Sequence, residues 1–114
     1  MIAVIFEVVP LDGKRDAYLA MAAALREQLD GIDGFLSIER FESLTQPGKL
    51  LSLSFWRDED AVRRWRNVSD HRSAQEAGRQ RILADYRLRV AGVMRDYGMQ
   101  ERAEAPDDSK ARHG

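Results

Sequence analysis

The sequence of 114 residues contains no cysteine, only three prolines and no long apolar run. Without cysteine the chain has no disulfide framework, no thiolate nucleophile and no cysteine-ligated metal, which is compatible with a cytoplasmic protein. The longest mostly apolar run, residues 18–25, is far shorter than the roughly 20 residues of a membrane-spanning helix. The apolar N-terminal segment lacks a basic leader and a small-residue cleavage site, so we expect a strand there and no signal peptide.

Positive and negative charges nearly balance, but they are unevenly distributed. The net charge is −1, whereas residues 57–95 contain ten arginines, no lysine and six acidic residues. The planar guanidinium group matches carboxylates and other anions, so this composition fits anion recognition as well as ordinary solvated helix and strand faces. Nucleic-acid binding needs a continuous basic stripe and a basic domain, and the sequence offers neither. We therefore expect no nucleic-acid partner and no membrane partner.

The first half of the chain reads as a strand, a helix and a hairpin. Residues 2–9 are rich in Val, Ile and Phe, which is typical of a strand. In residues 13–30 apolar side chains recur at three- and four-residue steps, which predicts an amphipathic helix. Residues 34–44 and 50–56 have strand character and flank a short Pro-Gly turn, so they are expected to form a hairpin.

The second half completes an α+β arrangement. Acidic residues at positions 58–60 predict a helix start, because they cap free amides and meet the positive end of the helix dipole. A further helix is expected over about residues 69–84, followed by a last strand over residues 86–97. The order β-α-β-β-α-β is that of ferredoxin-like domains with an antiparallel sheet.

In such a domain helices cover one face of the sheet and leave the other bare. We expect the bare face to carry some of the large apolar side chains Phe6, Phe35, Phe41, Phe55, Trp56 and Met94. Exposed apolar area of that size usually marks an interface. The pattern therefore predicts a homodimer packed sheet to sheet, with a pocket between sheet and helices in each protomer.

The end of the chain has a different composition. From residue 100 onward it contains Ala, Asp, Pro, Ser and charged residues, with no large apolar side chain. Such a segment buries too little surface to offset its ordering entropy. We therefore expect a single domain over residues 1–99 and a disordered tail over residues 100–114.

The sequence resembles the antibiotic biosynthesis monooxygenase (ABM) superfamily, whose members are dimeric α+β barrels. The resemblance covers residues 1 to about 98 and rests on three segments: GFLSIERFESL, LLSLSFWRDEDAVRRWR and HRSAQEAGR. It implies a ferredoxin-like protomer in a dimeric α+β barrel. Within the superfamily it implies either a cofactor-independent monooxygenase of a small aromatic or quinol-like molecule, or a non-catalytic small-molecule or haem-binding dimer.

Two residues are candidates for catalysis. Trp65 is similar in position to the family tryptophan that borders the active-site pocket, although a core anchor for its short helix is the alternative. His71 is the only histidine within the domain, and the unperturbed pKa of a histidine side chain lies near neutrality. Cofactor-free oxygenation needs a base unless the substrate ionises by itself, so His71 is the candidate base. The alternative is a solvent-facing or capping histidine.

Haem and metal sites have weaker support. The haem-degrading relatives place an axial histidine about ten residues after the tryptophan, where this chain has Gln75. No other grouping of His, Asp or Glu has metal-ligand spacing, and His113 belongs to the tail. We therefore expect no metal and no cofactor. Polar contacts to a ligand are predicted for a further set of residues, each of which is alternatively a surface residue: Asn67, Arg72, Gln75, Arg79 and Tyr86.

Overall fold

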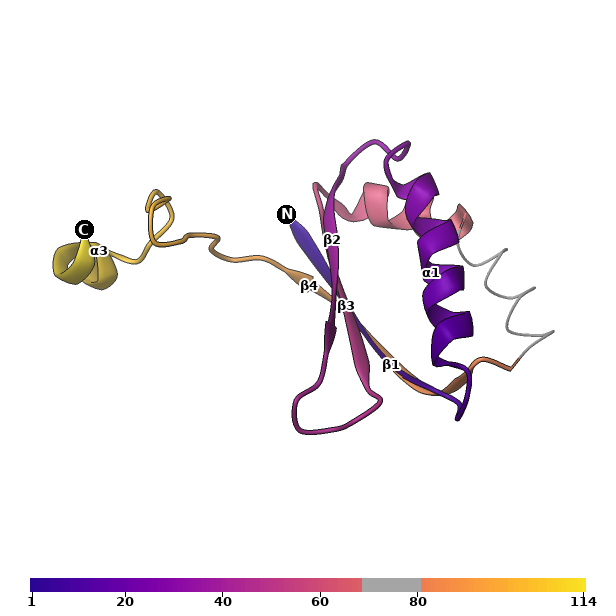
Figure 1. The fold of residues 1–114 in the computed structure, drawn as a ribbon. Coiled ribbons are helices and arrows are strands. Elements are labelled where there is room, and N and C mark those ends of the chain that lie inside the picture. The colour runs from indigo at the N-terminus through magenta and orange to yellow at the C-terminus, as the bar shows by residue number, and fades with distance from the viewer. Residues whose placement is uncertain (69–80) are drawn as a thin grey trace.

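The computed structural model describes residues 1–68 and 81–114 (Figure 1). A helical segment over residues 59–68 has no label in the figure. The labelled elements are β1 (Ile2–Pro10), α1 (Arg15–Leu29), β2 (Phe35–Glu42), β3 (Leu50–Trp56), β4 (Leu83–Gly92) and α3 (Asp107–His113).

The four strands form one antiparallel sheet in the order β2-β3-β1-β4. Helix α1 and residues 59–68 lie on the same side of this sheet, and the other side is uncovered by these helices (Figure 1). This arrangement confirms the ferredoxin-like α+β fold predicted from the sequence. No helix in the described part of the chain is long and apolar enough to cross a membrane.

Strand pairing sets the rows of side chains that face the helices. One row runs across all four strands as Arg40, Ser52, Phe6 and Leu88. Side chains alternate between the two faces of a strand, so every second residue of β3 joins this face. The alternation is clear in the burial of β3, where Leu50, Ser52, Ser54 and Trp56 are buried and the residues between them are partly exposed.

The core consists of two apolar clusters under the helices. One is formed by Val8, Tyr18, Ala22, Leu50 and Ile82, and the other by Leu29, Trp56, Ala61 and Val62. Helix α1 contributes to both clusters through residues spaced four and seven apart, as its predicted apolar stripe requires. The two clusters thus fix both ends of α1 on the sheet.

The start of helix 59–68 is held by the acidic residues that predicted it. The Asp58 carboxylate accepts a hydrogen bond from the Ala61 amide at 2.9 Å, which is an N-cap contact. Arg57 donates two hydrogen bonds of 3.0 Å to Asp33, one to each carboxylate oxygen. This pair links the connection before β2 to the end of β3, so it fixes where the helix leaves the sheet.

The composition of the uncovered sheet face differs from the prediction. Phe6, Phe35 and Trp56 lie on the helix-covered face, and Trp56 is completely buried there. The uncovered face carries Phe41 and Phe55, as expected, together with Ile5, Leu51 and Leu53. The face is therefore apolar, as predicted, but three of the five aromatic residues named for it lie on the helix-covered face instead.

The last strand and the tail also differ in detail. Strand β4 begins at Leu83, inside the segment predicted as helix, and ends at Gly92 rather than at residue 97. Residues 107–113 form a short helix that the sequence did not predict, at a distance from the sheet (Figure 1). Arg102 hydrogen-bonds Gly98, Ser109 and Gly114, all within the C-terminal segment. The domain boundary near residue 99 stays a prediction.

Candidate functional site

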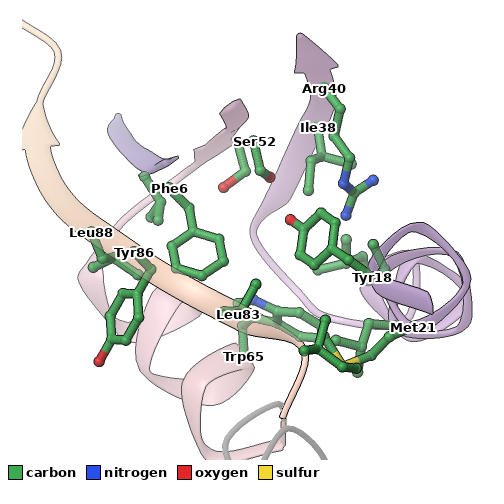
Figure 2. Close-up of a pocket in the computed structure, with 16 residues that line it drawn as sticks. Phe6, Tyr18, Met21, Ile38, Arg40, Ser52, Trp65, Leu83, Tyr86 and Leu88 are labelled. Atoms are coloured by element: carbon green, nitrogen blue, oxygen red, sulfur yellow. The ribbon is translucent and has the colours of Figure 1, made fainter. Parts of the chain in front are cut away.

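A cavity of about 540 Å³ lies between the sheet and the helices. All four strands, α1 and the segment 59–68 contribute to its lining, and most of the lining side chains are apolar (Figure 2). It lies where α1 spans the sheet between its two anchored ends. A cavity of this size and lining is typical of a small-molecule site.

Trp65 forms part of the wall of the cavity. Its ring stacks on Trp56 with a centroid distance of 6.3 Å and an interplanar angle of 26°. Trp56 in turn meets the edge of Phe35 and donates a hydrogen bond from Nε1 to Ser54 Oγ at 2.9 Å. Trp65 therefore packs against the core through Trp56 and also belongs to the cavity lining.

Tyr86 also lines the cavity, at the opposite side from α1 (Figure 2). Its ring lies 5.8 Å from that of Phe6, and 63% of its surface is exposed. This exposure places Tyr86 at the rim of the cavity. Asn67 is exposed and does not line the cavity. The predicted residues His71, Arg72, Gln75 and Arg79 lie outside the described residues.

One corner of the cavity is polar, and sequence reasoning missed it. Arg40 of β2 lines the cavity together with Tyr18 of α1 and Ser52 of β3 (Figure 2). Arg40 and Ser52 are paired neighbours in the sheet, and Ser52 is buried. Arg40 is the only charged residue that lines the cavity in the described part of the chain. The available signal was its position two residues after Ile38, which places both on one face of β2.

The environment of Tyr18 keeps its hydroxyl protonated. Burial raises the pKa of Tyr18 above its ordinary value of 10, and the opposing effect of the nearby Arg40 guanidinium, which lowers it, is smaller. A protonated phenol can donate a hydrogen bond. The corner therefore offers a cation and hydroxyl donors beside an apolar wall.

Metal binding has no visible support in residues 1–68 and 81–114. These residues contain no group of three or more His, Asp or Glu side chains that could hold a metal ion. The apolar wall and the single arginine fit an organic molecule rather than a hydrated cation. The expectation that the protein uses no cofactor stays a prediction.

The fold and the cavity together define a small ferredoxin-like α+β domain with an internal cavity. The family model described as "Antibiotic biosynthesis monooxygenase" matches residues 1–77. The chain belongs to this family, as its sequence resemblance indicated.

Two curated relatives are similar in sequence. Jasmonate monooxygenase ABM of Pyricularia oryzae is 52% identical over 93 residues, which are 82% of this chain and 43% of that protein. The uncharacterized protein YqjZ of Bacillus subtilis is 35% identical over 68 residues, which are 60% of this chain and 58% of that protein. The chain thus spans about half the length of these relatives.

Solved structures share the fold. Rv0793 from Mycobacterium tuberculosis has a TM-score of 0.71 at 23% identity, covering 85% of this chain and 98% of its own. PA3566 from Pseudomonas aeruginosa has a TM-score of 0.67 at 17% identity, covering 82% of this chain and 93% of its own. At these identities the likeness concerns the fold alone.

Proposed function

We propose that this chain is a cytoplasmic monooxygenase domain that oxidises a small, mostly apolar molecule in the cavity without a metal or flavin. The observation that carries the proposal is an apolar cavity with a single charged residue among its described lining, in a chain of the ABM family. The 52% identity to a protein named as a jasmonate monooxygenase supports oxygen chemistry on a small organic substrate. Aromatic and quinol-like molecules are the proposed substrate class.

Cofactor-free oxygenation requires the substrate to supply the electrons. A base removes a proton from an acidic C–H or phenol, and the resulting carbanion reduces O₂. When a CH₂ group becomes a carbonyl, one oxygen atom stays on carbon and the other leaves as water, and the carbon supplies all four electrons. The apolar wall suits this step because it excludes water from the reacting carbanion.

The residues keep the roles proposed from the sequence. His71 is the proposed base, and Trp65 shapes the cavity against which the substrate packs. Tyr86 is the proposed polar contact at the rim, supported by its position in the cavity lining. Polar contacts from further residues complete the proposal: Arg72, Gln75 and Arg79.

We further propose that the active form is a homodimer packed through the uncovered sheet face. Ile5, Leu53 and Phe55 form apolar neighbours on this face, and no helix of the described chain covers it (Figure 1). A second copy would remove this apolar surface from water, at roughly 25 cal/mol per Å². A charged substitution at Phe55 would bury an unpaired charge there.

Oxygen uptake by the purified, EDTA-treated protein tests the proposed function. The panel contains hydroquinones, anthrone-like phenols and jasmonate, each with and without NADPH, because hydroxylation of a saturated carbon needs two further electrons. We expect uptake with at least one substrate that needs no NADPH, and one ¹⁸O atom from ¹⁸O₂ in its product. Binding without oxygen uptake across the panel would contradict the enzyme and favour the non-catalytic small-molecule or haem-binding dimer.

A further inference from the structure

Arg40 is a charged residue in mostly apolar surroundings. It lies on the helix-covered face of β2, in the cavity lining, among mostly apolar residues. Its Nε atom is shielded from solvent and has no hydrogen-bond partner among the described residues. A buried donor without a partner costs about 1–3 kcal/mol, and more when the group is charged. The Arg40 guanidinium therefore has a donor at this corner of the cavity that a bound acceptor could satisfy.

The protein does not supply the missing anion from the neighbouring carboxylate. Glu42 lies two residues further along the same face of β2, but it pairs with Arg15 of α1 at 3.6 Å. No carboxylate of the described chain lies within ion-pair distance of Arg40, whereas six other arginines and lysines there do have such a partner. Arg40 is therefore the cation that a ligand can reach from inside the cavity.

Two hydroxyl-bearing residues line the cavity together with this cation. Tyr18 extends from α1 beside the guanidinium of Arg40, and its hydroxyl points into the cavity (Figure 2). Ser52 is the paired neighbour of Arg40 across the sheet. The same row continues into Phe6 and Leu88, which are apolar. One row of the sheet thus passes from a polar end to an apolar end across the cavity floor.

We propose that Arg40, Tyr18 and Ser52 form a carboxylate-binding subsite, so that the cavity takes an apolar molecule bearing one carboxylate. The guanidinium fork matches the two oxygen atoms of a carboxylate, and the hydroxyls supply further donors. The apolar end of the row accommodates the rest of the molecule. This inference rests on the proposed function in placing the substrate in the cavity, and it narrows the substrate class to organic acids.

Binding without turnover tests the subsite separately from the oxygenase activity. Isothermal titration calorimetry compares 4-phenylbutyrate and jasmonate with their primary amides, which have nearly the same shape and no charge. We expect at least one acid to bind about tenfold more tightly than its amide. Equal affinity of acid and amide for both pairs, or binding of neither, overturns the proposal. Failure of the oxygen-uptake test leaves this comparison unaffected.

Variants assign the preference to individual residues. Arg40→Met should abolish the preference for the acid and leave the amide affinity within about twofold, because only the charged contact is lost. Arg40→Lys should retain part of the preference, since it keeps the charge and loses the fork. Tyr18→Phe should weaken acid binding by about threefold. Arg26→Met, which removes an arginine of α1 that pairs with Asp30 and does not line the cavity, is the matched control and should leave the preference for the acid unchanged.

A measurement on the unaltered protein covers the case in which Arg40→Met does not fold. The Arg40 Nε–H resonance, assigned with the help of Arg40→Lys, should shift on addition of the acid and not on addition of the amide. A preference that persists in Arg40→Met, or an Nε–H resonance that ignores the acid, refutes the subsite.

Discussion

Gly34 is the position at which a single added methyl group should disturb both the fold and the cavity. It has a φ of +94°, and a β-carbon built on it lies 2.6 Å from the β-carbon of Ala61. Ala61 belongs to the same helical segment, residues 59–68, that carries Trp65. The close approach of Gly34 and Ala61 therefore sets how near this helix lies to the sheet, and with it the position of Trp65 on the cavity wall.

The expected cost of Gly34→Ala has two parts. A left-handed backbone conformation costs a residue with a β-carbon about 1–2 kcal/mol. Overpacking a close contact costs about a further 1–3 kcal/mol. The sum, about 2–5 kcal/mol, is a large fraction of the roughly 5–15 kcal/mol that stabilises a typical domain.

Gly48→Ala is the matched control for the backbone part. Gly48 has a similar φ of +84°, but a β-carbon built on it meets no other described atom within 4 Å. It should lose only about 1–2 kcal/mol. Ala61→Gly should recover part of the loss in the Gly34→Ala background, although glycine in a helix costs up to about 1 kcal/mol by itself.

Urea unfolding followed by tryptophan fluorescence measures these free energies, because Trp56 and Trp65 are stacked next to the altered contact. Equal losses in the Gly34 and Gly48 variants would refute the close contact. So would strict additivity of Gly34→Ala and Ala61→Gly. Weaker ligand binding in the Gly34 variant, measured below its unfolding transition, would connect this contact to the cavity.

Other parts of the molecule support four further predictions. The hydrogen bonds from Arg57 lower the pKa of Asp33 below its ordinary 3.8. Asp33→Asn should therefore be less stable than the unaltered protein above pH 3.8, and this difference in unfolding free energy should vanish as the pH falls through the lowered pKa. A difference that stays constant in acid unfolding experiments would contradict this. Truncation after Met99 should leave the melting temperature and the dimer unchanged, and a drop of more than a few degrees would show that the tail docks on the domain. Phe55→Asp should give a monomer or an unfolded chain in sedimentation experiments, whereas an intact dimer would exclude packing through the uncovered face. His71→Ala should lower turnover by about two to four powers of ten, while Trp65→Phe should mainly raise KM; unchanged turnover in the histidine variant would move the chemistry to a self-ionising substrate.

The sequence predicted the elements well wherever one pattern dominated. Strand β3 alternates without interruption and was predicted with its exact bounds, Leu50–Trp56. Helix α1 has a continuous apolar stripe and lies within its predicted range. The acidic cap of helix 59–68 was also recognised, because Asp58 is both an N-cap residue and a partner for the helix dipole.

The sequence did not predict which face of each strand the helices cover. Both faces of this sheet carry large apolar side chains, so alternation alone separates two sets without saying which is the core. Trp56 and Phe55 are adjacent aromatics, yet Trp56 is completely buried under the helices and Phe55 lies on the uncovered face. Only the tertiary contacts of Trp56 with Trp65 and Phe35 decide between them.

Arg40 was missed for the same reason. A lone arginine between Glu39 and Phe41 in a strand reads as a solvent-facing residue, and its pairing with Ser52 becomes visible only in the register of β2 and β3. Among the candidates named from the sequence, by contrast, Trp65 was chosen by its resemblance to a family residue, and the others were chosen for the chemistry of their side chains. Most of the polar contacts predicted from the sequence lie in residues 67–79, whereas the polar corner of the cavity includes Arg40 and Ser52 of the sheet.

Glu7 on the uncovered face and Arg40 on the cavity face differ in whether the chain supplies an oppositely charged partner. On the uncovered face, Glu7 has two partners within the chain, Arg89 at 3.0 Å and Lys49 at 3.3 Å, and these contacts lower its pKa. A carboxylate that is paired in this way can be covered by a second copy without becoming an isolated ion. On the cavity face, Arg40 has no carboxylate partner in the described structure. Because an unpaired cation beside apolar walls is stabilised when an anion arrives, the cavity face is suited to a charged ligand and the uncovered face to another protein surface.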